Sequence, residues 1–109
     1  EIYSKKVMII DDDPMTLKYL EKSLTKLGYK VTPMDNPHIA FDSLETEQPD
    51  LLILDLLMPQ MTGFEFLQQI RSQPKYSKLK VIVGTSRSDK EDLAEIFKLG
   101  ANDYLAGTG

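Results

Sequence analysis

Short runs of apolar residues alternate along this chain with segments in which apolar residues recur at helical spacing. The apolar runs predict five strands, at residues 7–10, 29–34, 51–54, 79–83 and 102–106. A segment of helical periodicity follows each of the first four runs. This alternation is typical of βαβ units, and right-handed crossovers then place the strands in one parallel sheet. The pattern therefore predicts an open α/β domain with helices on both faces of the sheet.

Local signals mark the ends of these elements. Asp13 followed by Pro14 is typical of a helix N-cap and first helical residue. Capping-box patterns begin at Thr62 and at Ser88, each with a glutamate three residues later. Pro33 lacks the N–H that a central strand would use, so the second strand is expected at an edge of the sheet.

Composition narrows the class of protein. The chain has 109 residues, of which 41% are hydrophobic, enough for one domain with its own core. The net charge of −4 argues against direct nucleic-acid binding, and the absence of cysteine excludes disulfides and thiolate metal sites. No apolar run approaches membrane-spanning length, and residues 1–6 contain no apolar signal region. We therefore expect a cytoplasmic domain that contacts neither membrane nor nucleic acid.

Acidic residues follow two of the predicted strands. Asp11, Asp12 and Asp13 come directly after the first strand, and Asp55 ends the apolar run of the third. In an open parallel sheet, ligands bind beyond the carboxyl ends of the strands, near the switch in strand order. Carboxylates crowded there would repel one another, and Mg²⁺ would offset that repulsion because it prefers oxygen ligands. Solvated strand ends are the alternative for Asp11, Asp12 and Asp55, whereas Asp13 is better explained as a helix cap.

Polar and aromatic residues near the other strand ends are less specific. Thr85 and Ser86 follow the fourth strand, where a hydroxyl could bond a phosphoryl or carboxyl oxygen, although ordinary loop chemistry is the alternative. Tyr104 on the last strand is typical of half-buried packing. His38, the single histidine, is expected at the surface, and the five methionines are expected in the core and loops.

In combination, four segments of the chain resemble receiver domains of two-component response regulators. The resemblance covers almost all of the sequence. The segments that show it are Val7–Pro14, Asp50–Gly63, Val81–Ser86 and Leu99–Leu105. It implies a flavodoxin-like fold with strand order 2-1-3-4-5.

The resemblance also implies chemical roles. Asp55 matches the phosphoacceptor, Thr85 the switch hydroxyl and Tyr104 the switch aromatic residue. The implied Mg²⁺ ligands are Asp11, Asp12, Asp55 and the backbone carbonyl of Leu57. The phosphoryl donor would be a histidine kinase or a phosphotransfer protein. Such a domain catalyses only its own phosphorylation and dephosphorylation, and it does not turn over a free substrate as an enzyme does.

The chain departs from the family pattern at its C-terminal end. Gly107 stands where receiver domains carry a lysine after the fifth strand, so we expect phosphorylation that is slow or poorly coupled to the switch. The usual fifth helix is missing from the sequence, which predicts an exposed apolar part of the sheet. We interpret residues 1–109 as a single truncated or engineered receiver domain that dimerises through this surface. A swapped or symmetric natural dimer is the alternative explanation.

Two other functions remain as alternatives. The first is a pseudo-receiver that serves as an interaction or dimerisation module without efficient phosphorylation. The second is a phosphohydrolase with an aspartate nucleophile. Leu56 and Leu57 argue against it, because no second acid stands two residues after Asp55 to act as general acid.

Overall fold

The computed structural model describes residues 5–85 and 90–106, which form one five-stranded sheet and its covering helices. The strands are β1 (Lys6–Ile10), β2 (Lys30–Met34), β3 (Leu51–Asp55), β4 (Lys80–Thr85) and β5 (Asp103–Ala106). The helices are α1 (Pro14–Lys26), α2 (Pro37–Glu47), α3 (Gly63–Arg71) and α4 (Lys90–Lys98), with a short 3-10 helix, η1 (Pro74–Tyr76). Each predicted strand and helix is present, and only η1 was not predicted.

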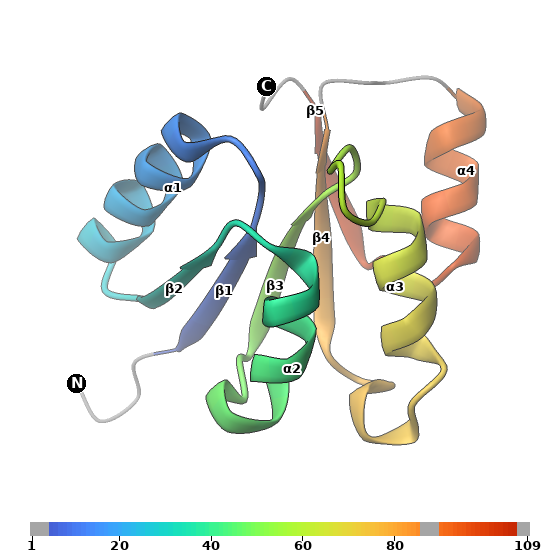
Figure 1. Ribbon diagram of the computed structural model, residues 1–109, viewed down its shortest axis with the longest axis horizontal. Coiled ribbons are helices and arrows are strands. Elements are labelled where there is room, and N and C mark those ends of the chain that lie inside the picture. Colours follow the sequence, from blue (N-terminus) through green and yellow to red (C-terminus); the bar gives the residue numbers. More distant parts are fainter. Residues whose placement is uncertain (1–4, 86–89, 107–109) are drawn as a thin grey trace.

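All strand pairs are parallel, in the order β2-β1-β3-β4-β5 (Figure 1). This confirms the flavodoxin-like fold and the edge position of the strand that contains Pro33. The strand order reverses between β1 and β3, which pair directly, with Ile10 opposite Leu54. The residues that follow these two strands therefore emerge side by side at the carboxyl edge of the sheet.

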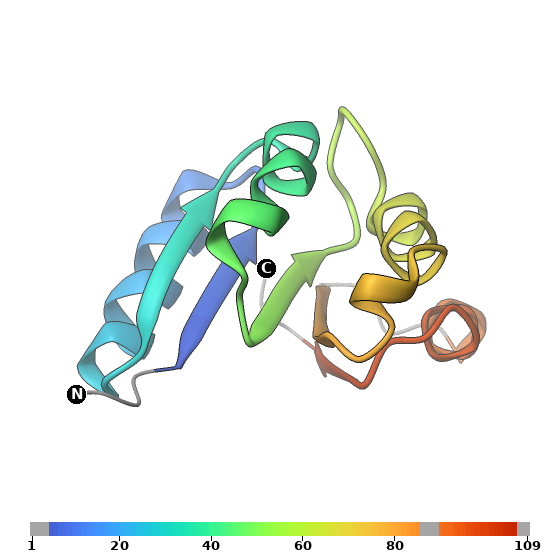
Figure 2. The ribbon, with the colours of Figure 1, turned by 90° about the horizontal axis from the view of Figure 1, so that it is seen from below.

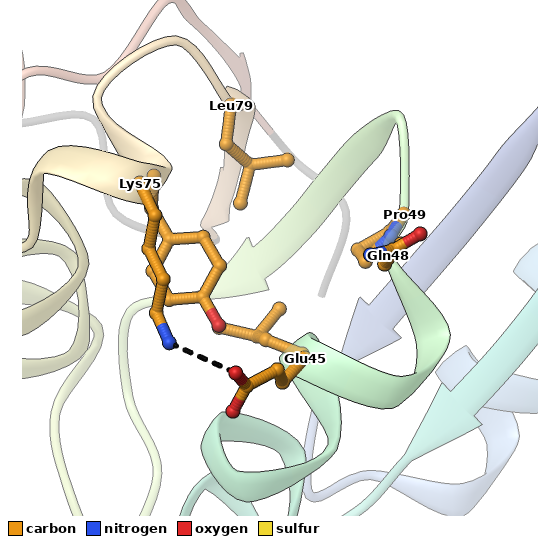
Figure 3. A pocket seen from close by; sticks show the side chains of 7 residues that line it. Glu45, Gln48, Pro49, Lys75 and Leu79 are labelled. Carbon is orange, nitrogen blue, oxygen red and sulfur yellow. Dashed lines mark ion pairs between the residues drawn. The ribbon is translucent and has the colours of Figure 1, made fainter.

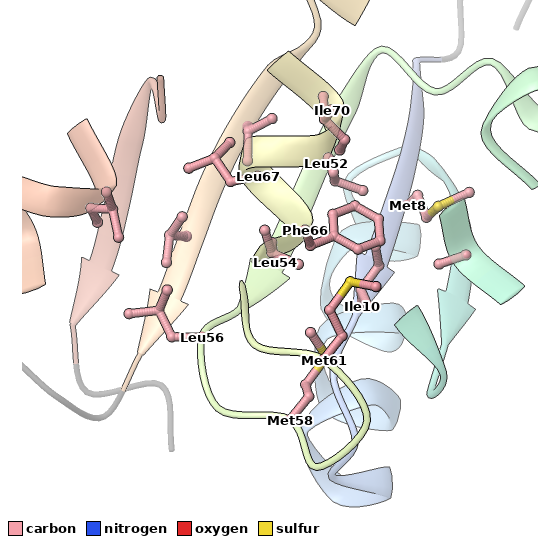
Figure 4. Close-up of a cluster of buried hydrophobic side chains, with 14 of the residues drawn as sticks. Met8, Ile10, Leu52, Leu54, Leu56, Met58, Met61, Phe66, Leu67 and Ile70 are labelled. Carbon is pink, nitrogen blue, oxygen red and sulfur yellow. The ribbon is translucent and has the colours of Figure 1, made fainter. Parts of the chain in front are cut away.

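Helices cover both faces of the sheet, as the periodicity predicts (Figure 2). The larger core cluster joins one face of the sheet to α2, α3 and α4, and Figure 4 shows its centre around Phe66. Phe66 is fully buried and meets the ring of Phe41 edge-on, with ring centroids 5.7 Å apart. Burial of a side chain of this size contributes roughly 2–3 kcal/mol, so this cluster anchors α2 and α3 to the strands that end at the acidic residues.

The opposite face is covered by α1 over only part of its width. The second core cluster joins Leu17 of α1 to β1 and β3, and it contains no residue of β4 or β5. Ile82 of β4 lies opposite Ile53 in the register and so shares this face. Leu105 of β5 lies on the same face and is 43% exposed. Within residues 5–85 and 90–106, no helix follows β5.

The methionines do not all lie where the sequence predicts. Met8, Met58 and Met61 are buried, in agreement with the prediction, but Met15 is 79% exposed. Met15 is the second residue of α1 and precedes Leu17, the buried residue of that helix, so it points away from the core. The prediction that every methionine lies in the core or a loop is therefore wrong for Met15, an apolar side chain on the exposed face of α1.

None of the helices described is both long enough and apolar enough to cross a bilayer.

Candidate functional site: an acidic pocket at the carboxyl edge of the sheet

The three aspartates that follow β1 have different roles. Asp13 is the N-cap of α1: its carboxylate accepts a hydrogen bond from Thr16 Oγ1 at 2.6 Å and from the Met15 N–H at 3.3 Å. These bonds stabilise the carboxylate, the Thr16 hydroxyl most strongly, and lower the pKa of Asp13. The prediction that Asp13 caps a helix is confirmed, and its side chain is accounted for without a ligand.

The remaining acidic side chains converge. Asp11, Asp12 and Asp55 each offer one carboxylate oxygen, and these three atoms lie within 4.8 Å of one another. The pairing of β1 with β3 produces this convergence, because it places the residues after Ile10 beside Asp55 at the end of β3. The sequence-based expectation of one acidic cluster beyond two adjacent strands is therefore met by the geometry.

Burial and repulsion between the carboxylates dominate the electrostatics of the cluster. Burial, and then repulsion by Asp11, raises the pKa of Asp55 from 3.8 to about 7, against the lowering effect of the Leu57 and Leu56 backbone amides. Burial also raises the pKa of Asp11, with repulsion from its acidic neighbours adding to the effect. A raised pKa means that the ionised form is disfavoured. A cation bound among these oxygens would relieve both the desolvation and the repulsion.

The loop between β3 and α3 holds the backbone of Asp55 in place. The Gly63 N–H donates to the Leu56 carbonyl at 2.8 Å, and the loop side chains Met58 and Met61 are buried beneath it. A Cβ atom at Gly63 would lie 2.5 Å from the Asp55 carbonyl oxygen, so only glycine permits this approach. Sequence reasoning missed this role of Gly63. The available signal was a glycine at the first position of a helix, where most residues form helix better.

The same loop ends in the capping box that the sequence predicts. Thr62 and Glu65 exchange hydrogen bonds: the Glu65 N–H donates to Thr62 Oγ1 at 3.2 Å, and the Thr62 N–H donates to Glu65 Oε1 at 3.0 Å. The box fixes where α3 begins and therefore where Gly63 meets Asp55.

The structure describes the other predicted site residues only in part. Thr85 ends β4 opposite Ala106, at the same edge of the sheet as Asp55, but its side chain lies outside the described part of the structure. The Leu57 backbone amide acts to lower the pKa of Asp55, and the role of the Leu57 carbonyl stays a prediction. Tyr104 is half-buried and meets Phe97 of α4 edge-on, with ring centroids 6.0 Å apart. Ser86, the Ser88 capping box and Gly107 all lie outside the described residues.

A separate cleft of about 340 Å³ lies at the amino edge of the sheet, between the end of α2 and η1 (Figure 3). Its polar feature is an ion pair between Lys75 Nζ and Glu45 Oε2 at 3.4 Å, and both side chains are more than half exposed. None of the acidic cluster residues lines it. The cleft is therefore remote from the chemistry at Asp55.

Comparisons with known proteins agree with this geometry. The profile of the response regulator receiver domain matches residues 7–107. The chain is 39% identical over 100 residues to protein RcaC of Microchaete diplosiphon, covering 92% of this chain and 15% of that protein. It is 38% identical over 99 residues to an uncharacterized 14.6 kDa protein of Leptolyngbya boryana, covering 91% of this chain and 76% of the relative.

Solved structures give the same result. The chemotaxis protein CheY4 of Vibrio cholerae superposes with a TM-score of 0.90 at 28% identity, over 95% of this chain and 87% of that one. The receiver domain of a DNA-binding response regulator from Colwellia psychrerythraea 34H also gives 0.90, at 31% identity, over 95% and 86% of the two chains. With the sheet order, the acidic cluster and the family match in agreement, this chain belongs to the response regulator receiver domain family.

Proposed function

We propose that the chain accepts a phosphoryl group on Asp55 from a histidine kinase or a phosphotransfer protein. One observation carries this proposal: one carboxylate oxygen from each of Asp11, Asp12 and Asp55, at the ends of β1 and β3, lies within 4.8 Å of the others. In this arrangement the pKa of Asp55 is raised to about 7. Perturbed carboxylates in such an arrangement are typical of functional sites. Membership of the receiver domain family supports the same assignment.

The donor set fits Mg²⁺. The ligands would be one oxygen each from Asp11, Asp12 and Asp55, and the backbone carbonyl of Leu57. When bound, the ion supplies positive charge that stabilises the ionised carboxylates and neutralises phosphoryl oxygens. All three side chains provide hard oxygen ligands, and no cysteine competes for a softer metal.

The transfer itself requires a nucleophile aligned with the phosphorus atom. An ionised Asp55 oxygen attacks the phosphorus of the phosphohistidine, so an O–P bond forms as the P–N bond breaks. The leaving imidazole keeps the electron pair of that bond and takes up a proton. The Leu57 and Leu56 backbone amides stabilise the ionised form of the attacking carboxylate. In this proposal the hydroxyl of Thr85 then bonds the new phosphoryl group, and Tyr104 responds to the movement.

The test is labelling by acetyl phosphate, measured by mass spectrometry with and without Mg²⁺. We expect Mg²⁺-dependent addition of one phosphoryl group, which is lost in Asp55→Asn and reduced at least about tenfold in Asp12→Asn. Asp13→Asn is the matched control, because asparagine is an equally good N-cap and Asp13 belongs to the same run of three acids. Labelling of Asp55→Asn at the wild-type level, or equal loss in the Asp13→Asn control, would refute the assignment.

Gly107 favours a second function, an interaction module without efficient phosphorylation. It stands where the resemblance implies a lysine, so a fixed positive charge beside the phosphoryl group is absent from the sequence. Gly107→Lys is then expected to raise the rate of acetyl phosphate labelling severalfold, because a lysine there would offset negative charge on the phosphoryl group. Equal rates in the two proteins would show that the missing lysine does not limit the reaction.

We also propose that a second copy of the chain covers the open part of the sheet. Leu105 is 43% exposed on the face that α1 leaves uncovered, and Tyr19 of α1 is 70% exposed. Exposed apolar surface of this kind is typical of protein interfaces. Light scattering across a concentration series tests the proposal, with Leu105→Glu expected to shift the protein to monomer. A wild-type chain that stays monomeric throughout would exclude the dimer.

A further inference from the structure

Arg71, the last residue of α3, bonds entirely to carbonyl-type oxygens from other parts of the chain. Its Nε and Nη2 atoms donate to the Gly100 carbonyl at 3.0 and 2.8 Å, and Nη1 donates to the Tyr76 carbonyl at 2.8 Å. Nη2 also donates to Asn102 Oδ1 at 3.1 Å. No carboxylate pairs with this guanidinium among the described residues. Its positive charge is therefore held by dipoles alone.

The accepting carbonyls lie at the ends of two helices. Tyr76 is the last residue of η1, and Gly100 lies two residues after the end of α4. Carbonyl groups at helix C-termini lack intrahelical partners and carry partial negative charge. A planar guanidinium can bond several of them at once in a fixed orientation, which a lysine ammonium cannot do. Arg71 thus joins the ends of η1 and α4 to the end of α3.

Gly100 and Asn102 extend this contact into the sheet. Gly100 has φ of +108°, and a Cβ atom there would lie 2.9 Å from Arg71 Nε, so glycine is needed for both conformation and space. Asn102 Oδ1 also accepts from the Val81 N–H at 2.9 Å, and the Asn102 N–H donates to the Val81 carbonyl at 2.9 Å. We call Arg71, Gly100 and Asn102 the arginine clamp. It secures the start of β5 against β4.

The two ends of α4 differ in how they are held. Its C-terminal end is secured by the arginine clamp at the amino edge of the sheet, with Ile96 fully buried one turn earlier. Its first residue, Lys90, comes five positions after Thr85, which ends β4 at the carboxyl edge of the sheet. Figure 1 shows α4 running beside α3 from one edge of the sheet to the other. Asp55 lies at the edge where α4 begins.

We propose that Arg71 is a positioning residue that fixes the C-terminal end of α4 and the start of β5, so that any change in α4 on phosphorylation of Asp55 is confined to the part of the helix away from this anchor. The inference rests on the proposed phosphoacceptor function of Asp55. Tyr104 contacts Phe97 in the last turn of α4, so the β5 aromatic ring packs against the anchored end of this helix.

Residue-resolved amide hydrogen exchange tests this proposal. It is measured in the wild type, Arg71→Lys and Lys75→Gln, each with and without Mg²⁺ and beryllofluoride, an analogue of the phosphoryl group. Lys75→Gln is the matched control, because it removes a cation four positions from Arg71 but outside the arginine clamp, one that pairs with Glu45 at 3.4 Å and lies over the Tyr76 ring, 5.2 Å from its centroid. Asn102→Ala replaces Arg71→Lys if the latter does not fold, since it removes one acceptor of the same contact.

In the wild type and the control, beryllofluoride is expected to change the exchange rate of the Leu93 amide. The exchange rates of the Ala101 and Asn102 amides are expected to stay within about twofold of their values without beryllofluoride. In Arg71→Lys, we expect those two amides to exchange about tenfold faster before loading, and loading to alter exchange at both ends of α4. Met8 and Ile9 in β1 serve as internal references for global stability.

Three results would overturn the anchor. They are equal beryllofluoride-induced changes at both ends of α4 in the wild type, a wild-type pattern in Arg71→Lys, and a uniform acceleration that includes Met8 and Ile9. Failure of the proposed function would look different. It would abolish acetyl phosphate labelling of the wild type, whereas the exchange of Ala101 and Asn102 in the unloaded variant would still decide whether Arg71 holds this end of α4.

Discussion

Partly buried charged groups have opposite surroundings at the two edges of the sheet. At the carboxyl edge, the Asp55 carboxylate lies beside other carboxylates, and its pKa is raised to about 7. At the amino edge, the Arg71 guanidinium directs its donors at the Gly100 and Tyr76 carbonyls and at Asn102 Oδ1. Burial lowers the pKa of Arg71, but the group has hydrogen-bond partners for its charge. A charge that lies among dipoles of opposite sign supports the fold, whereas like charges held close together leave a site ready to bind a cation or react.

This contrast predicts opposite effects on stability when each charge is removed, and the largest is expected at Arg71. Arg71→Met keeps the apolar stem but removes the guanidinium donors to the Gly100 and Tyr76 carbonyls and to Asn102 Oδ1. The Tyr76 carbonyl keeps the Leu79 N–H at 3.2 Å, and Asn102 Oδ1 keeps the Val81 N–H at 2.9 Å. We expect the free energy of unfolding to fall by about 3 kcal/mol, because hydrogen bonds to charged groups contribute roughly 1.5–3 kcal/mol each and water replaces part of that loss. Urea denaturation measures the change. A loss below about 1 kcal/mol would show that the clamp adds little to stability.

Gly63→Ala tests the packing that supports the acidic edge. The added methyl group would lie 2.5 Å from the Asp55 carbonyl oxygen and 2.8 Å from the Leu56 Cα atom, and neither backbone atom can move freely. We expect a loss of about 2 kcal/mol, typical of overpacking, together with slower acetyl phosphate labelling because Asp55 is displaced. Gly28→Ala is a control without overpacking, since a Cβ there meets nothing within 4 Å, and a loss of stability at this position comes from backbone strain at its φ of +98°.

Asp55→Asn is expected to stabilise the metal-free domain, the opposite of the effect at Arg71. The pKa of Asp55 is raised in the folded state from 3.8 to about 7, so the folded protein binds more protons and loses stability as pH rises between those values. Because the carboxyl group is only half buried, we discount for solvent screening and expect a gain of about 1–2 kcal/mol at pH 8.

The pH dependence distinguishes this cause from a simple change in packing. The stabilisation by Asp55→Asn should vanish near pH 4, where the wild-type carboxyl is protonated in the folded state, and saturating Mg²⁺ should reduce it at pH 8. Thermal unfolding at the two pH values, with and without Mg²⁺, is the measurement. An effect that is constant across pH would contradict the electrostatic explanation.

The smallest effect is expected for Lys75→Gln. The Lys75–Glu45 pair joins side chains that are 51% and 78% exposed, so solvent screens their attraction. We expect a change in the free energy of unfolding below about 0.5 kcal/mol. Adding 0.5 M NaCl should leave the difference between the two proteins almost unchanged. A loss comparable to that of Arg71→Met would show that exposure does not separate these two cations.

Much of the fold and the central part of the site followed from local sequence signals. The apolar runs and their periodicity gave the five parallel strands, because strands covered by helices on both faces must be apolar throughout. Asp13 with Pro14 identified the start of α1, and Thr62 with Glu65 that of α3, because caps are satisfied within a few residues. Asp11, Asp12 and Asp55 could be placed together because adjacent parallel strands end at the same edge.

Other features depended on residues far apart in the chain, and only the tertiary structure decided them. Arg71 is 29 residues from Gly100, and no local pattern indicates that its donors would meet that carbonyl. The contact of Gly63 with the Asp55 carbonyl depends on how the loop closes over buried methionine side chains. The sequence determined where charges and glycines occur. The folded chain decided which charges lie among dipoles of opposite sign and which lie among like charges, because burial and hydrogen bonding are properties of the whole packed structure.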